Sequence, residues 1–229
     1  MNPLDGANER VSRADEHLLD LKQRVNLLRR EKFKRIVVNT QRIMLRPPIG
    51  NGWATFRVIE IPPSRQPMII SILVGEVIYN LRAALDYLVY ELARFDAKQI
   101  VKNTQFLIED TPKGFLSHAK RRLNGLNPRH FAAIESLQPF KGCDWTKTLA
   151  SISNPDKHMR LTFIDCPVRS ASQTSSTEAL GAEQTVNMDD IAAIEVIFRD
   201  GMPVVETLEQ LKLKVVETLD SFKPEFERR

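Results

Sequence analysis

The segment from Met68 to Phe95 constrains the fold more than any other part of the chain, because it is the longest strongly apolar run with helical periodicity. On a helix that turns about 100° per residue, its apolar side chains fall within an arc of roughly 120°. These residues are Ile70, Val74, Val77, Ile78, Leu81, Ala84, Leu85, Leu88 and Leu92. An apolar arc of this width packs against a core, so the sequence predicts a central helix that the rest of the chain covers.

One polar stripe follows the edge of this apolar arc. It consists of Gly75, Tyr79, Arg82, Asp86 and Tyr90. Arg82 and Asp86 are one turn apart, so their side chains can form an ion pair. Gly75 costs about 1 kcal/mol in a helix interior and would let a ligand or another backbone come close. Asn80 lies roughly 160° from Arg82 around the helix, so these two residues cannot bind one ligand. The stripe is either an ordinary helix-surface ion pair or a candidate site.

Local patterns predict the other helices and strands. Helical spacing indicates a long first helix and a terminal amphipathic helix, and an Asn or Thr before Pro indicates the start of two short helices. Runs of β-branched residues on both sides of the turn at residues 47–52 indicate two antiparallel strands. The expected helices cover about Asn8–Arg35, Pro112–Leu123, Pro128–Leu137, Thr146–Ile152 and Val205–Phe222, and the expected strands Ile36–Leu45, Trp53–Ile61, Met159–Ile164 and Ile191–Phe198.

This order of elements predicts an α+β fold, with a helical core around the long central helix and a small, mostly antiparallel sheet. A chain of 229 residues can bury roughly 70% of its unfolded surface. No repeat or linker divides it, so we expect a single α+β domain over residues 1–229, flexible at residues 1–7 and 170–177.

Composition excludes several classes of protein. The net charge of +4 is compatible with an anionic partner but too small to require one. Cys143 and Cys166 have no CxxC spacing, which argues for a reducing compartment and against zinc. The N-terminal residues are polar and charges interrupt the apolar run, so we expect no signal peptide, no membrane span and a cytoplasmic protein. No dinucleotide-binding, P-loop, zinc-protease or serine-hydrolase motif occurs, and we expect no cofactor and no metal.

Two basic clusters are candidates for contact with RNA or another anionic partner. The first includes Arg29 and Arg30 in the first predicted helix, and the second includes Arg121 and Arg122, with His118 nearby. Clustered cations can neutralise phosphates. Few aromatic residues are interleaved for stacking on bases, so solvated helix flanks are the competing interpretation.

A further polar segment runs from Asn154 to Arg160. Lys157 and His158 lie within it, just after the expected turn at Asn154. Histidine titrates near neutral pH, which suits general acid or base chemistry. The alternative is a structural turn in which Asn154 and Asp156 form caps and His158 bonds to the backbone.

Two of these segments resemble an uncharacterised bacterial protein family. Its pattern is a G-x-x-x-x-NLR-x-x-LD helix followed downstream by N-x-D-K-H-R, and the likeness covers roughly residues 10 to 220. The matching positions are Gly75, Asn80, Leu81, Arg82, Leu85 and Asp86 in the helix, and Asn154, Asp156, Lys157 and His158 downstream. The chain departs from the pattern at Met159, which moves the last arginine to Arg160. The resemblance carries no activity over to this chain.

A weaker resemblance is to HEPN-type ribonucleases, helical proteins that often dimerise and cleave RNA with an Arg and a His four to six residues apart. In such a site the His takes the proton of a ribose 2′-hydroxyl and the Arg stabilises charge on the phosphate. This sequence lacks that spacing, and its predicted strands differ from an all-helical HEPN core. The resemblance therefore requires a composite catalytic site of Arg82, Asp86, Lys157 and His158.

Two functions stay open. The first is a HEPN-like RNA-cleaving or nucleic-acid-binding protein of the toxin or defence type, which requires Arg82 and His158 to lie within about 10 Å of each other. The second is a non-enzymatic protein-interaction module, in which the same residues form a structural Arg–Asp–His network and the terminal helix forms a homodimer surface. The sequence does not decide whether the protein is an enzyme.

Overall fold

The computed structural model describes residues 2–33, 37–45, 52–60, 68–158, 164–165, 176–177, 196–198 and 200–227. The chain divides into two compact units. Residues 1–22, 68–163 and 204–229 form one, which we term the helical unit, and residues 23–67 and 164–203 form the other, which we term the hairpin unit. Whether the two fold together as the single domain expected from the sequence stays a prediction.

The described part of the helical unit contains helices and no strand, and the protein is mostly helical, so the predicted α+β fold is wrong. The apolar faces of its long helices cover one another, and a core built in this way needs no sheet. The helices are α1 (Asp5–Phe33, which continues into the hairpin unit), α2 (Met68–Ala97), α3 (Pro112–Arg122), α4 (Pro128–Ser136), the 3₁₀ helix η1 (Pro139–Lys141), α5 (Asp144–His158) and α6 (Val204–Glu227).

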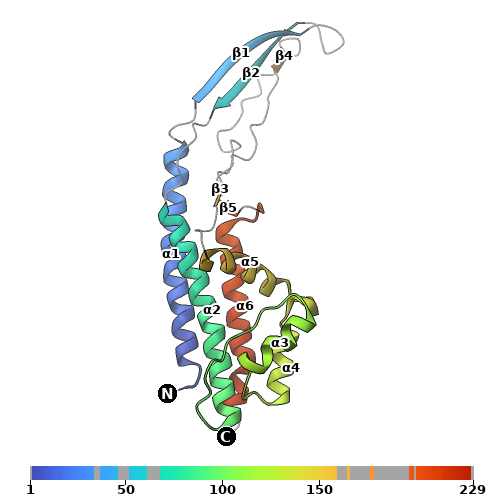
Figure 1. The fold of residues 1–229 in the computed structure, drawn as a ribbon. Coiled ribbons are helices and arrows are strands. Elements are labelled where there is room, and N and C mark those ends of the chain that lie inside the picture. Colours follow the sequence, from blue (N-terminus) through green and yellow to red (C-terminus); the bar gives the residue numbers. More distant parts are fainter. Residues whose placement is uncertain are drawn as a thin grey trace. The chain divides into compact units, whose positions relative to one another are not determined.

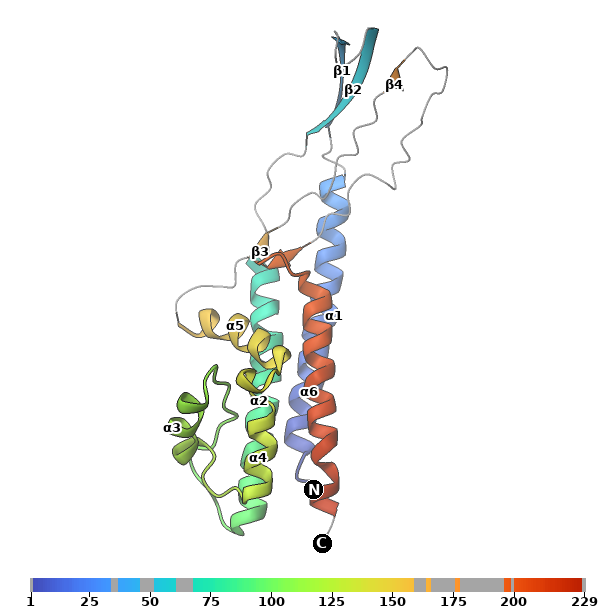
Figure 2. The ribbon, with the colours of Figure 1, turned by 90° about the vertical axis from the view of Figure 1, so that its right-hand side faces the viewer.

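Within the helical unit, residues 5–22 of α1 lie side by side with the long helices α2 and α6, and α1 runs opposite to the other two (Figures 1 and 2). Each has apolar residues three or four positions apart and therefore one apolar face. The central helix and the terminal helix are confirmed as α2 and α6. The buried apolar residues of α6 are Val204, Leu208, Leu211, Val215, Leu219 and Phe222.

Helix α2 is long and apolar enough to cross a membrane, by length and composition alone. In this structure 56% of its most apolar window is buried inside the protein. Ile70, Val77 and Leu85 are among its fully buried residues. This burial is what the predicted role of a core helix requires.

The first helix begins earlier than predicted because Asn2 and Asp5 cap its first turn. The Asn2 side-chain oxygen accepts a hydrogen bond from the Leu4 amide at 3.0 Å, and the Asp5 carboxylate accepts one from the Asn2 amide at 2.8 Å. This reciprocal arrangement is a capping box. Leu4 and Ala7 are buried beside it, so the chain packs from Leu4 onward, where we expected a flexible start.

The short helices α3 and α4 begin where the sequence predicts. The Thr111 hydroxyl accepts a hydrogen bond from the Gly114 amide, and the Asn127 side chain accepts one from the His130 amide. Helix α5 differs from the predicted Thr146–Ile152, because it begins at Asp144 and continues to His158. Proline can kink a helix without ending it, and α5 continues through Pro155.

The hairpin unit holds all the described strands. Strands β1 (Val37–Leu45) and β2 (Gly52–Glu60) pair antiparallel, close to their predicted positions. The two-residue strand β4 (Ser176–Thr177) pairs with β2, and β3 (Ile164–Asp165) pairs with β5 (Ile197–Phe198). Residues 159–163, 170–175 and 191–195, which belong to the other predicted strands and the predicted loop, lie outside the described residues.

Candidate functional site

Arg82 and Asp86 both bind the main chain of Phe106. Arg82 Nη2 donates a hydrogen bond to the Phe106 carbonyl oxygen at 3.2 Å, and Asp86 Oδ1 accepts one from the Phe106 amide at 2.8 Å. Phe106 is fully buried, so its main-chain groups need partners inside the protein. The predicted polar pair thus holds the segment that follows α2 against α2 itself.

The guanidinium of Arg82 is enclosed, because the residue is only 8% exposed. No acceptor within hydrogen-bonding distance of its Nε and Nη1 atoms is described. Burial lowers the pKa of Arg82, and the negative charge of Asp86 opposes that shift. An arginine in this position has little surface to offer a phosphate from solvent.

Two further residues of the predicted catalytic site, Lys157 and His158, lie at the end of α5. Their side chains lie outside the described residues. The expected proximity of Arg82 and His158 therefore stays a prediction.

Asn80 lies away from Arg82 on α2, in agreement with the helical geometry predicted from the sequence. Its side-chain oxygen accepts a hydrogen bond from Arg10 Nη1 of α1 at 3.3 Å. Its amide nitrogen donates to the Glu76 carbonyl oxygen at 2.9 Å. Asn80 is thus used in the contact between α1 and α2, whereas Arg82 faces Phe106.

The basic clusters are only partly described. The side chain of Arg29 lies outside the described residues, and Arg30 is exposed. On the last turn of α3, Arg121 is exposed and Arg122 is half-buried. One turn before them, the exposed His118 places its Nδ1 atom 2.6 Å from a carboxylate oxygen of Glu109.

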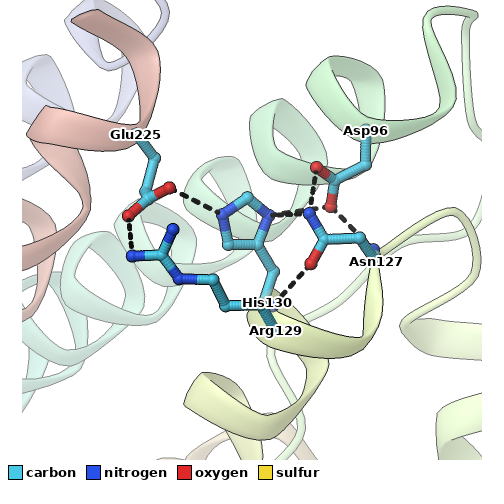
Figure 3. Close-up of polar contacts among 5 residues, drawn as sticks. All are labelled: Asp96, Asn127, Arg129, His130 and Glu225. Atoms are coloured by element: carbon cyan, nitrogen blue, oxygen red, sulfur yellow. Dashed lines mark hydrogen bonds and ion pairs between the residues drawn. The ribbon is translucent and has the colours of Figure 1, made fainter. Parts of the chain in front are cut away.

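A buried histidine cluster connects the ends of three helices (Figure 3). His130, at the start of α4, places Nδ1 2.8 Å from Asp96 Oδ2 of α2 and Nε2 3.6 Å from Glu225 Oε2 of α6. The other Glu225 oxygen forms an ion pair with Arg129 at 2.7 Å. Asp96 also accepts hydrogen bonds from the main-chain and side-chain nitrogens of Asn127, both at 2.8 Å.

This histidine cluster is better suited to structure than to catalysis. The side chain of His130 is 3% exposed and that of Asp96 is 5% exposed, so a substrate cannot reach the ring. Asp96 also places a negative charge at the N-terminus of α4, where it is stabilising. Sequence reasoning identified the Asn127 cap but had no signal for the pairing of His130 with Asp96 and Glu225, which are distant in sequence.

The described residues offer no metal site. No group of three or more His, Cys, Asp or Glu side chains within them could hold a metal ion. In the histidine cluster the two carboxylates flank opposite nitrogens of the His130 ring, so they do not converge on a common point.

No family model, curated protein or solved structure matches this sequence. The likeness to the family with the NLR-x-x-LD helix and the weaker likeness to HEPN-type ribonucleases therefore stay predictions.

Proposed function

We propose that the protein is a non-enzymatic protein-interaction module that forms a homodimer through an exposed face of α1 and α2. This face, which we term the tyrosine face, consists of Arg10, Ile72, Glu76, Tyr79 and Tyr87. Its two tyrosines are 57% and 41% exposed, and Ile72 is 41% exposed. Large apolar and aromatic groups held in this way at a surface are typical of interaction sites.

The observation that carries the proposal is the position of Arg10 over both tyrosine rings. Its guanidinium carbon lies 5.9 Å from the centroid of Tyr79 and 5.7 Å from that of Tyr87. Cation–π contacts at these distances hold the rings in place before binding. Tyrosine and arginine, with tryptophan, are enriched among the residues that contribute most of the binding energy in protein interfaces.

Charge complementarity favours a second copy of the chain as the partner. The tyrosine face carries the cation Arg10 and the exposed anion Glu76. In a two-fold dimer the same patch meets itself, so Arg10 of each protomer can approach Glu76 or a tyrosine ring of its partner. A surface of this kind is complementary to itself without any other partner.

The polar residues of the predicted site and of the histidine cluster bind other groups inside the protein, which supports a non-enzymatic function. Arg82 and Asp86 bind Phe106, and His130 lies between Asp96 and Glu225. The RNA-cleaving alternative needs Arg82 at a phosphate, and its burial speaks against that role.

Sedimentation velocity tests the homodimer. We expect the wild-type protein to be dimeric at about 100 µM and the Tyr79→Glu variant to be monomeric, because a carboxylate would be buried in the interface. Leu116→Glu is the matched control, since Leu116 is also 57% exposed but lies on α3. A monomeric wild-type protein, or a Tyr79→Glu variant that stays dimeric, would reject the proposal.

A second candidate function is RNA binding on α3. The observation that favours it is the grouping of Arg121, Arg122 and the exposed His118 within one turn, with no ion pair described for either arginine. Fluorescence anisotropy with a single-stranded RNA tests it. We expect Arg121→Ala with Arg122→Ala to weaken binding and to reduce its salt dependence, whereas Arg13→Ala, on α1, should leave both unchanged.

A further inference from the structure

A pocket of about 380 Å³ lies in the helical unit. The end of α2, the start of the chain and the end of α6 lie at one end of this unit (Figure 1). The last turns of α2, the residues just after it, the start of the chain and the end of α6 all contribute to its wall. The lining includes Pro3, Glu91, Arg94, Phe95, Lys98 and Phe226. Its volume is in the range of sites that bind small molecules.

One side of the pocket is apolar and aromatic. The rings of Phe95 and Phe226 meet edge to face, with centroids 5.6 Å apart. Both residues are only half-buried, and the neighbouring Ile100 is 76% exposed. An apolar ligand body would remove this surface from water, which is favourable.

The charges of the lining leave one cation uncompensated. Glu91 and Arg94 form an ion pair at 3.1 Å, in which the Glu91 side chain is only 13% exposed. Lys98 is exposed. Among the residues that the structure describes, its ammonium group forms no ion pair. The pocket therefore favours a ligand with a single negative charge.

The backbone of Lys98 has the left-handed conformation, with φ of 53°. Glycine or asparagine usually occupies such a position after a helix, because side chains with a Cβ are strained there. In this protein the position is a lysine, and its positive charge is the one in the pocket lining that no described carboxylate compensates. Strained residues of this kind are common at ligand sites.

We propose that this pocket binds a small monoanionic amphiphile, of the class of medium-chain carboxylates, with its carboxylate on Lys98 and its apolar body against Phe95 and Phe226. This inference does not rest on the homodimer, because the tyrosine face and the pocket share no residue. Binding would require neither Arg82 nor the histidine cluster.

Isothermal titration calorimetry with decanoate, 1-decanol and decylamine tests the ligand class on the full chain. We expect decanoate to bind with one site per protomer and at least tenfold more tightly than the neutral or cationic probe, which is a difference of about 1.4 kcal/mol or more. Equal affinity for decanoate and decanol, tighter binding of decylamine, or no binding of decanoate at about 1 mM would each overturn the proposal.

Three variants assign the residues. We expect Lys98→Gln to weaken decanoate binding about tenfold, and Phe226→Ala to weaken binding without changing the preference for the anion. Lys102→Gln is the matched control, since Lys102 is an exposed lysine outside the pocket lining, and it should bind like the wild type. Unchanged affinity of Lys98→Gln would overturn the assignment.

The Lys98→Gly variant separates a binding role from a structural one. Glycine relieves the backbone strain, so we expect this variant to melt at a higher temperature than the wild type and yet to bind decanoate more weakly. A lower melting temperature together with wild-type binding would show that Lys98 serves the fold alone and would contradict the proposal.

Discussion

Arg82 and Asp86, one helical turn apart on α2, bind opposite main-chain groups of a single residue, Phe106. The sequence predicted either a helix-surface ion pair or part of a catalytic site for these two residues. In the structure they attach the segment that follows α2 to α2 itself. Their partner is the backbone of the chain itself.

Removal of the Arg82 guanidinium should destabilise the fold. We expect Arg82→Met to lower the free energy of unfolding by about 1–3 kcal/mol, because the Phe106 carbonyl loses its donor in a buried position. Urea unfolding followed by circular dichroism measures this change. Arg13→Met is the control, since the Arg13 side chain is 51% exposed and its ion pair with Glu16 is at the surface, and it should change stability by less than about 0.5 kcal/mol. Equal stability of both variants would show that the contact with Phe106 is not stabilising.

Arg82 and Asp86 should also be coupled, because they hold the same residue. In a double-mutant cycle, we expect the combined variant Arg82→Met with Asp86→Ala to lose less stability than the sum of the single variants, by about 0.5–3 kcal/mol. Once one substitution has removed a hydrogen bond to Phe106, this residue is less firmly positioned, so the remaining hydrogen bond contributes less to stability. Strict additivity in the same unfolding experiment would indicate that the two residues act independently.

The histidine cluster should be a second source of stability. His130→Leu leaves the buried Asp96 carboxylate without one of the three hydrogen-bond donors described for it, so we expect a loss of about 1–3 kcal/mol. His118→Leu is the matched control, because the side chain of His118 is 58% exposed and it pairs with Glu109 at the surface. Thermal unfolding of the two variants should therefore differ by several degrees. Similar melting temperatures would argue against a structural role for His130.

The stability of the protein should depend on pH through Glu91. Burial raises the pKa of Glu91 above its ordinary value of 4.5, and the charge of Arg94 opposes the shift. A carboxyl group with a raised pKa in the folded state stabilises the fold below its unfolded pKa, and this contribution is lost as the pH rises through the folded pKa.

Unfolding free energies of wild type and Glu91→Gln, measured from below pH 4.5 to neutral pH, test this assignment. The glutamine cannot ionise, so we expect the wild type to lose stability relative to the variant across this interval. Glu16→Gln, at a side chain that is 56% exposed, should show no such trend. A wild type that gains stability relative to Glu91→Gln as the pH rises would reverse the sign and refute the assignment.

The sequence by itself determined where most of the helices lie, because helix formation depends on local spacing and capping. The apolar period placed α2 and α6, the Thr111 and Asn127 caps placed the starts of α3 and α4, and the helical angle separated Asn80 from Arg82. Each of these features involves residues within a few turns of one another. The residues of the Asn2–Asp5 capping box are also close together in the sequence, but the prediction started the helix later, at about Asn8.

Only the tertiary structure decided the fold class and the roles of the polar residues. Strands β1 and β2 formed where β-branched residues predicted them, whereas β4 lies within the segment expected to be a loop. The apolar faces of α1, α2 and α6 bury one another, and no described strand belongs to the helical unit. Arg82 is buried because the distant Phe106 packs against it, and His130 is enclosed because Asp96 and Glu225 come from two other helices. The pairing of residues so far apart in sequence is set by packing, which local periodicity does not encode.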